Sequence, residues 1–288
     1  MKRLGGLFLA VLGYAGCYGP FCWFPSKIPL PGLALLPVST VAGLLLMLVL
    51  TTVMGWWGRV RGAAASWSGA FTSLIFLSTP LAYALPGVPA ITSSTIMKGA
   101  TTALGPVMDV WNGEKIRWES WVAVLMCAVA LAAGIKTSSL KLTLAAGVIY
   151  FVYTLAYAAR LRIMRDHRGS QTFFVTEHLV TNVTGLLLVL LLSVFSEDAR
   201  AGWSVRAWTD WRLWALGFAS QGVGLFGGWI LLYRRECSFT LPLNRSGALF
   251  ASTLVALLTG AGVSLASGVG VGLVLGAVFL LYFNERSA

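Results

Sequence analysis

The sequence predicts an all-α integral membrane protein whose ten transmembrane helices form two inverted five-helix repeats. Composition, the spacing of apolar segments and the distribution of basic residues predict this class. Of the 288 residues, 57% are hydrophobic and only 11% are charged, and the mean hydropathy is +0.80. A soluble domain carries roughly 25% charged residues, which it needs to cover its surface. The composition therefore excludes a soluble globular enzyme and a disordered chain, and four cysteines are too few for a disulfide scaffold.

Ten apolar segments account for most of the chain. They are expected at 4–24, 33–57, 63–85, 88–110, 121–135, 142–159, 171–195, 213–233, 238–260 and 267–283. A spanning helix needs about 20 residues, so 288 residues hold at most about ten spans with short loops. Because no expected loop exceeds about 17 residues, the chain has no room for a soluble domain. The function is therefore expected to lie within the bilayer.

Turn residues and charges separate the segments, since proline and glycine interrupt helices and charged side chains avoid the hydrocarbon core. In chain order, the breaks are the Pro-Ser-Lys-Ile-Pro stretch at 25–29, Gly58 to Gly62, Pro86-Gly87, Asn112 to Ser120, Lys136 to Lys141, Arg160 to Ser170, Ser196 to Arg212, and Arg234 to Glu236.

Basic residues near the span ends set the expected orientation, because Lys and Arg are enriched on the cytoplasmic side of a membrane. With the N-terminus in the cytoplasm, ten spans return the C-terminus to the same side. Thirteen basic residues then lie in the cytoplasm: Lys2, Arg3, Arg59, Arg61, Lys115, Arg117, Arg160, Arg162, Arg165, Arg168, Arg234, Arg235 and Arg286. Six lie on the opposite side: Lys27, Lys136, Lys141, Arg200, Arg206 and Arg212. Topology in the cell (inner) membrane thus explains the net charge of +11, and no nucleic-acid partner is expected.

Ten spans with both ends on one side divide into two halves of five, at residues 1–135 and 136–288. Because five is an odd number, the second half must be inverted relative to the first, as in many secondary transporters. An offset of 147 residues places Lys98 of the expected fourth span on Arg245 of the ninth. These are the two basic residues expected inside spans, so we predict that they flank a central cavity.

The exit of the fourth expected span resembles the drug/metabolite transporter superfamily. The small-residue stretch 101–107 leads into Gly-Glu-Lys at 113–115, and the family often carries Gly-Glu at this exit. The second half has Ala261 in place of the glutamate, so only the first half matches. The resemblance implies the ten-helix, EamA-like arrangement of two inverted repeats. The position of Asn244-Arg245 resembles that of a basic residue in the branch that carries sugar phosphates and nucleotide sugars. In that branch, the basic residue holds phosphate.

Lys98 and Arg245 are the first candidates for a substrate site, because a basic residue at the centre of a span costs about 2.5–3.5 kcal/mol on insertion. Two such cations across a cavity would bind an anion, with structural ion pairing as the alternative. Arg245 can hold a phosphate or carboxylate through two hydrogen bonds, whereas Lys98 acts as a point charge. The other candidates for substrate binding are Asn244, Tyr153, Tyr157 and Gln221, and further polar side chains that can line a cavity are Tyr14, Tyr18, Tyr150 and Asn182.

Glu177 and His178 form the other titratable pair expected inside a span. One functional interpretation is that the pair couples transport to protons. The other is that Glu177 is the counter-charge of Arg245 in the empty state. The structural alternative is that Glu177 belongs to an ion pair and that His178 hydrogen bonds to a backbone carbonyl. Asp109, at the end of the fourth span, is expected to be a helix-end or gate residue. With only two histidines and no carboxylate-rich ligand set, neither a metal site nor a cofactor is expected.

These residues predict a secondary transporter that moves a small anionic metabolite, expected to be phosphorylated, by alternating access. Exchange is favoured over uniport, because the two cations return more easily with a second anion bound. The alternatives are a transporter of neutral or zwitterionic solutes such as amino acids, in which Lys98 or Arg245 pairs with Glu177, and a flippase for a lipid phosphate. An enzyme is not expected, since clustered carboxylates and a nucleophile with a base are both lacking. The expected partners are the solute and the bilayer, with the chain as a monomer or homodimer.

Overall fold

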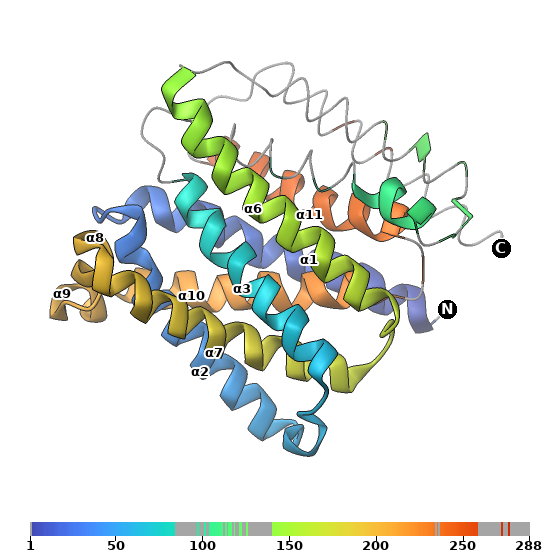
Figure 1. The fold of residues 1–288 in the computed structure, drawn as a ribbon, viewed down its shortest axis with the longest axis horizontal. Coiled ribbons are helices and arrows are strands. Elements are labelled where there is room, and N and C mark those ends of the chain that lie inside the picture. Colours follow the sequence, from blue (N-terminus) through green and yellow to red (C-terminus); the bar gives the residue numbers. More distant parts are fainter. Residues whose placement is uncertain are drawn as a thin grey trace.

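Long α-helices make up the described part of the protein, and no strand occurs among its residues (Figure 1). The computed structural model describes residues 2–83, 140–233 and 237–258, together with 97, 101, 104–111, 113, 115, 116, 118, 121, 122, 125, 235, 272 and 276. The long helices within these ranges are α1 (Lys2–Trp23), α2 (Leu36–Val53), α3 (Ala63–Tyr83), α6 (Leu140–Arg165), α7 (Gln171–Phe195), α10 (Trp211–Leu231) and α11 (Cys237–Leu258). Shorter elements connect them: the 3-10 helices η1 (Phe24–Lys27), η2 (Gly32–Leu35) and η3 (Trp57–Arg59), and the helices α8 (Glu197–Ala201) and α9 (Val205–Thr209).

Three helices of the described ranges are long and apolar enough to cross a membrane. They are Gly6–Trp23, Gly32–Val53 and Gln171–Phe195, with mean hydropathies of 1.3, 2.5 and 2.0. Apolar side chains of the third, such as Leu187, are exposed on the surface of the bundle, as lipid-facing side chains would be. Length, composition and exposed apolar surface together indicate a membrane protein.

The helix ends follow the expected segments closely in some places and depart from them in others. α7 begins and ends at the expected residues, 171 and 195. α6 departs most, because it continues to Arg165 where a loop was expected from Arg160 onward. The expected segments 121–135 and 267–283 lie largely outside the described residues. So does 88–110, except for the helical stretch 104–110 and residues 97 and 101. Ten spans therefore stay a prediction.

The helices pack in pairs that repeat between the two parts of the chain. α1 packs against α10, and α6 packs against α3; α2 packs against α10, and α7 packs against α3. α2 and α7 also contact each other. Exchanging α1, α2 and α3 with α6, α7 and α10 therefore maps one set of contacts onto the other (Figure 1).

Two glycines show the same equivalence at atomic detail. A Cβ atom on Gly69 of α3 would lie 2.7 Å from the carbonyl oxygen of Glu177 in α7. A Cβ atom on Gly217 of α10 would collide with the carbonyl oxygen of Ser39 in α2. Glycine is required at both positions because the two helix backbones touch there. The glycines are 148 residues apart and the carbonyl residues 138 apart, and each contact joins a helix of one half of the chain to a helix of the other.

Loops gather at two opposite ends of the bundle. At one end, Arg212 Nη1 donates a hydrogen bond to the carbonyl oxygen of Lys27 (2.7 Å), and α8 contacts η2. At the other end, the backbone N–H of Arg61 donates to Thr176 Oγ1 (2.9 Å), near the start of α7. Basic residues expected on opposite sides of a membrane are thus found at opposite ends of the bundle.

Candidate functional site

A cavity of about 70 Å³ lies beside Arg245, between α1, α3, α6, α10 and α11. We call it the Arg245 cavity, and it has room for several water molecules. Its walls are formed by Tyr14, Tyr18, Phe21, Thr72, Ile75, Phe76, Thr79, Met97, Tyr153, Tyr157, Arg160, Val223, Gly224, Gly227, Gly228, Leu231, Asn244 and Arg245. Four of the residues predicted from the sequence to bind substrate therefore meet in one place: Arg245, Asn244, Tyr153 and Tyr157.

Arg245 is a buried cation with few partners. Its side chain belongs to α11, and the residue is 4% exposed. Nη2 lies 3.4 Å from Tyr153 Oη, the guanidinium carbon lies 4.9 Å from the centre of the Tyr157 ring, and Nε is buried without a hydrogen-bond partner. Among the described residues, no carboxylate lies within ion-pair distance of it. Arginine stays protonated in proteins, so its positive charge is left uncompensated by these residues. Lys98, predicted to face it, lies outside the described residues.

Two pairs of tyrosines line the cavity around this charge. The rings of Tyr14 and Tyr18 in α1 have centres 5.6 Å apart, and those of Tyr153 and Tyr157 in α6 are 5.8 Å apart. Within each pair the residues are four positions apart, which places them on one face of the helix. The pairs are separated by 139 residues, and the two helices begin 138 residues apart, so the pairs occupy equivalent positions. The Tyr-x3-Tyr pattern, which occurs in both helices, is the feature of the sequence that groups these four tyrosines.

Arg160 is a second cation on the cavity wall, and Glu177 compensates it. Arg160 Nε donates to Glu177 Oε1 (2.8 Å), and Nη2 donates to Oε2 (3.3 Å). Ser68 Oγ donates to Glu177 Oε1 (2.5 Å), and Thr72 Oγ1 lies 3.3 Å from the same oxygen. Glu177 is fully buried and Arg160 is 5% exposed. A buried carboxylate with this many donors is held as the charged partner of Arg160.

The sequence-based assignment of Arg160 to a cytoplasmic loop is therefore wrong. The ion pair with Glu177 allows the helix to continue past a charge that would otherwise mark the end of a span. The expected pairing of Glu177 with Arg245 is also not observed, because Arg160 occupies both carboxylate oxygens. The sequence does contain an indication that Arg160 belongs to the helix and to the cavity wall. It follows Tyr157 by three residues and Tyr153 by seven, which places all three on one helix face.

His178 is fully buried, beside Phe174 of its own helix and the glycines of α10. Its ring packs edge-on against Phe174, with centres 4.6 Å apart, and a Cβ atom on Gly228 would lie 2.8 Å from Nε2. Neither ring nitrogen has a hydrogen-bond partner among the described residues. The expected hydrogen bond to a backbone carbonyl is thus not formed, because an aromatic ring and the surface of α10 enclose the imidazole. Its role in proton coupling stays a prediction.

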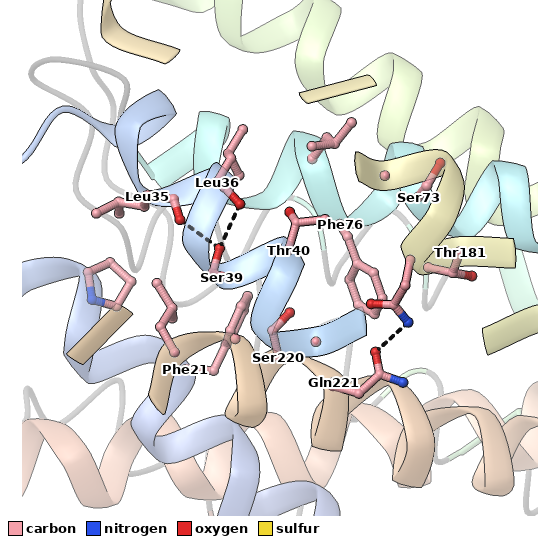
Figure 2. Close-up of a pocket in the computed structure, with 17 residues that line it drawn as sticks. Phe21, Leu35, Leu36, Ser39, Thr40, Ser73, Phe76, Thr181, Ser220 and Gln221 are labelled. Atoms are coloured by element: carbon pink, nitrogen blue, oxygen red, sulfur yellow. Dashed lines mark hydrogen bonds between the residues drawn. The ribbon is translucent and has the colours of Figure 1, made fainter. Parts of the chain in front are cut away.

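A second cavity, of about 50 Å³, contains Gln221 and lies between α1, α2, α3, α7 and α10 (Figure 2). We call it the Gln221 cavity. It is lined by Phe21, Pro25, Leu35, Leu36, Ser39, Thr40, Gly43, Ser73, Phe76, Leu77, Thr181, Asn182, Gly185, Leu216, Gly217, Ser220 and Gln221. None of these lining residues is charged. The structure therefore separates Gln221 from the other predicted substrate residues, and Phe21 and Phe76 line both cavities.

Asp109 holds the start of the helix that carries Arg245. One carboxylate oxygen accepts from Cys237 N–H (3.0 Å), and the other accepts from Ser238 N–H (2.7 Å) and Ser238 Oγ (2.6 Å). A carboxylate at a helix N-terminus satisfies N–H groups that have no partner within the helix. Asp109 was expected to act at the end of its own span; the structure shows instead that it binds the start of α11.

Comparisons with known proteins support the fold alone. No family model matches the sequence, and no curated protein matches it. Among solved structures 27 chains match. One of them, described as "Crystal structure of protein", aligns with a TM-score of 0.67 over 98% of this chain and 98% of its own, at 15% sequence identity. The chain is therefore similar in fold to the whole length of a solved protein.

Proposed function

We propose that the protein is a secondary transporter for a small anionic solute, expected to be phosphorylated, which Arg245 binds in its cavity. The observation that carries this proposal is the buried Arg245 side chain, whose Nε has no partner and whose charge no described carboxylate compensates. An unpaired charge in a low-dielectric interior is unfavourable, so an anion is favoured at this place. Nε and an Nη group together match the two oxygens of a phosphate or carboxylate.

Alternating access is supported by the equivalent packing of the two parts of the chain. We propose ten spans in two inverted repeats, at 1–135 and 136–288, with the cavity between them. The Tyr-x3-Tyr pairs of α1 and α6 and the glycine contacts at Gly69 and Gly217 recur as such repeats require. Rocking of one repeat against the other would open the cavity to each side in turn. The proposed role is transport rather than catalysis.

Both termini are proposed to be cytoplasmic. This orientation is supported by the positions of basic residues. Arg61 lies at one end of the bundle, and Lys27 and Arg212 lie at the opposite end. Tags at both termini are expected to be accessible only from the cytoplasm, and a tag within 196–212 only from the other side. Termini that report opposite sides would rule out the five-plus-five arrangement.

Thermal stabilisation of purified protein by inorganic phosphate tests the anion site. Phosphate at 100 times its dissociation constant is expected to add about 2.7 kcal/mol to the wild type and nothing to Arg245→Ala. Arg245→Lys keeps the charge but loses the two-point geometry, so binding weakens by about 1–2 kcal/mol. The matched control Arg206→Ala changes an exposed arginine and is expected to respond like the wild type.

Uptake of labelled phosphate into proteoliposomes is the functional readout. Arg245→Ala is expected to abolish it, and unlabelled phosphate inside the vesicles is expected to accelerate it if the protein is an exchanger. Equal binding and uptake in wild type and Arg245→Ala would overturn the anion proposal. Stabilisation by a zwitterionic amino acid but not by phosphate would favour the transport of zwitterionic solutes instead.

A further inference from the structure

Gln221 carries a hydrogen-bond donor without a partner in the wall of an uncharged cavity. The residue is 1% exposed, its Oε1 accepts from Asn182 Nδ2 (2.9 Å), and its Nε2 is buried without a partner among the described residues (Figure 2). A buried amide N–H that lacks an acceptor is unfavourable by about 1–3 kcal/mol, so native structures rarely leave one. A ligand with an oxygen acceptor would satisfy it.

The neighbouring hydrogen bonds determine which end of the Gln221 amide is free. Asn182 Nδ2 also donates to the carbonyl oxygen of His178 (2.7 Å), and only the NH₂ end of the asparagine can do so. The NH₂ group of Asn182 therefore faces Gln221, which must offer its own oxygen in return. Gln221 Nε2 is left as the group available to a ligand.

The lining of the Gln221 cavity selects an uncharged group. The cavity contains no charged side chain among its lining residues, so a charged group would be desolvated there without compensation. Ser39 Oγ donates to the carbonyl oxygen of Leu35 (2.6 Å), which leaves its lone pairs to accept. A hydroxyl group of a solute would accept from Gln221 and could donate to such an oxygen, and a carbonyl group would accept from Gln221 alone.

The two cavities lie in succession along α10. Gln221 is followed after three residues by Gly224 and after six by Gly227, which lies beside Asn244 in the Arg245 cavity. Six residues of helix correspond to about 9 Å. The Phe76 ring rests on Gly224, where a Cβ atom would lie 2.8 Å from its tip, and so lies at the boundary between the cavities.

We infer that Gln221 forms a second solute subsite, which binds an uncharged oxygen of the same solute whose anionic end Arg245 binds. This inference rests on the proposed function. It specifies the solute class as an anion that carries an uncharged hydroxyl or carbonyl oxygen several bonds away from its charged end. We expect Phe76, which lines both cavities, to move when one solute occupies both subsites.

The inference is tested with 6-hydroxyhexyl phosphate and hexyl phosphate, which differ only in the terminal hydroxyl group. Their binding to the full chain is measured by thermal stabilisation across a concentration series. The wild type is expected to bind the hydroxylated compound roughly threefold to tenfold more tightly, as one additional neutral hydrogen bond provides. Gln221→Leu and Gln221→Met are expected to bind the two compounds equally. Gln171→Leu, at an exposed glutamine, is the matched control and should keep the preference.

The outcomes separate this inference from the proposed function. If both compounds bind in an Arg245-dependent manner but equally well to the wild type, or if Gln221→Leu keeps the preference, the Gln221 subsite is refuted while the anion site stands. If neither compound binds the wild type, or if Arg245→Ala binds both unchanged, the anion site fails and the Gln221 inference fails with it.

Discussion

Glu177→Gln is expected to be strongly destabilising, because it leaves the charge of Arg160 buried without a partner. The side chains of Arg160 and Glu177 are 7% and 0% exposed, so solvent hardly screens the pair. Removing one partner of a buried ion pair costs about 3–5 kcal/mol. Glutamine keeps an oxygen for Ser68 and for Arg160 Nε, but its NH₂ group would replace Oε2, which lies 3.3 Å from Arg160 Nη2. Two donors would then face each other, so we expect a loss within this range.

A double variant distinguishes the buried charge from simple loss of packing. Arg160→Met combined with Glu177→Gln removes the unpaired charge and is expected to recover more than half of the lost stability. The assay is unfolding in detergent micelles, followed by the fluorescence of the 12 tryptophans. The matched control is Glu197→Gln, which alters an exposed pair with Arg200 (3.7 Å) and should change stability by less than about 1 kcal/mol.

Two results would refute this reasoning. One is a loss below about 1 kcal/mol for Glu177→Gln, since that is the value of an exposed pair. The other is a double variant no more stable than Glu177→Gln itself, because the damage would then come from the shape or hydrogen bonding at position 177 rather than from the charge of Arg160.

Two further predictions concern helix contacts, and a third concerns a half-buried ion pair. Gly217→Ala is expected to reduce the free energy of unfolding by about 1–3 kcal/mol, because the alanine Cβ would collide with the carbonyl oxygen of Ser39. An unchanged unfolding midpoint would contradict the close contact of α2 and α10. Asp109→Ala leaves the first N–H groups of α11 without their acceptor and should cost about 1–3 kcal/mol in the same assay, with a weakened phosphate response if α11 shifts. The pKa of Asp210 lies below its usual range because Arg212 donates hydrogen bonds to its carboxylate, so this pair stabilises the fold above the usual pKa of about 4 and loses that contribution as pH falls through the lowered value. The difference in melting temperature between wild type and Asp210→Asn should therefore shrink as the pH falls, and a constant difference would contradict the assignment.

The membrane class and the positions of several helices could be predicted from the sequence, because they depend on local composition. Apolar runs of sufficient length must be helical in a bilayer, where each backbone N–H and C=O needs a partner within its own segment. The bounds of α7 and the burial of Arg245 follow from this rule. The candidate site was predicted in part for the same reason: a cation or a tyrosine within an apolar run is conspicuous in the sequence.

Only the tertiary structure decided how the polar groups pair. Arg160 looks like the end of a span in the sequence, because no residue near it along the chain compensates its charge. The residue that does so, Glu177, is on another helix. Gln221 and Arg245 looked like members of one site, yet their helices direct them into two cavities that Phe21 and Phe76 border together. Composition and periodicity report what surrounds a residue along the chain. Compensation of a buried charge or amide depends on which side chain of another helix comes within about 3 Å, and packing alone determines that.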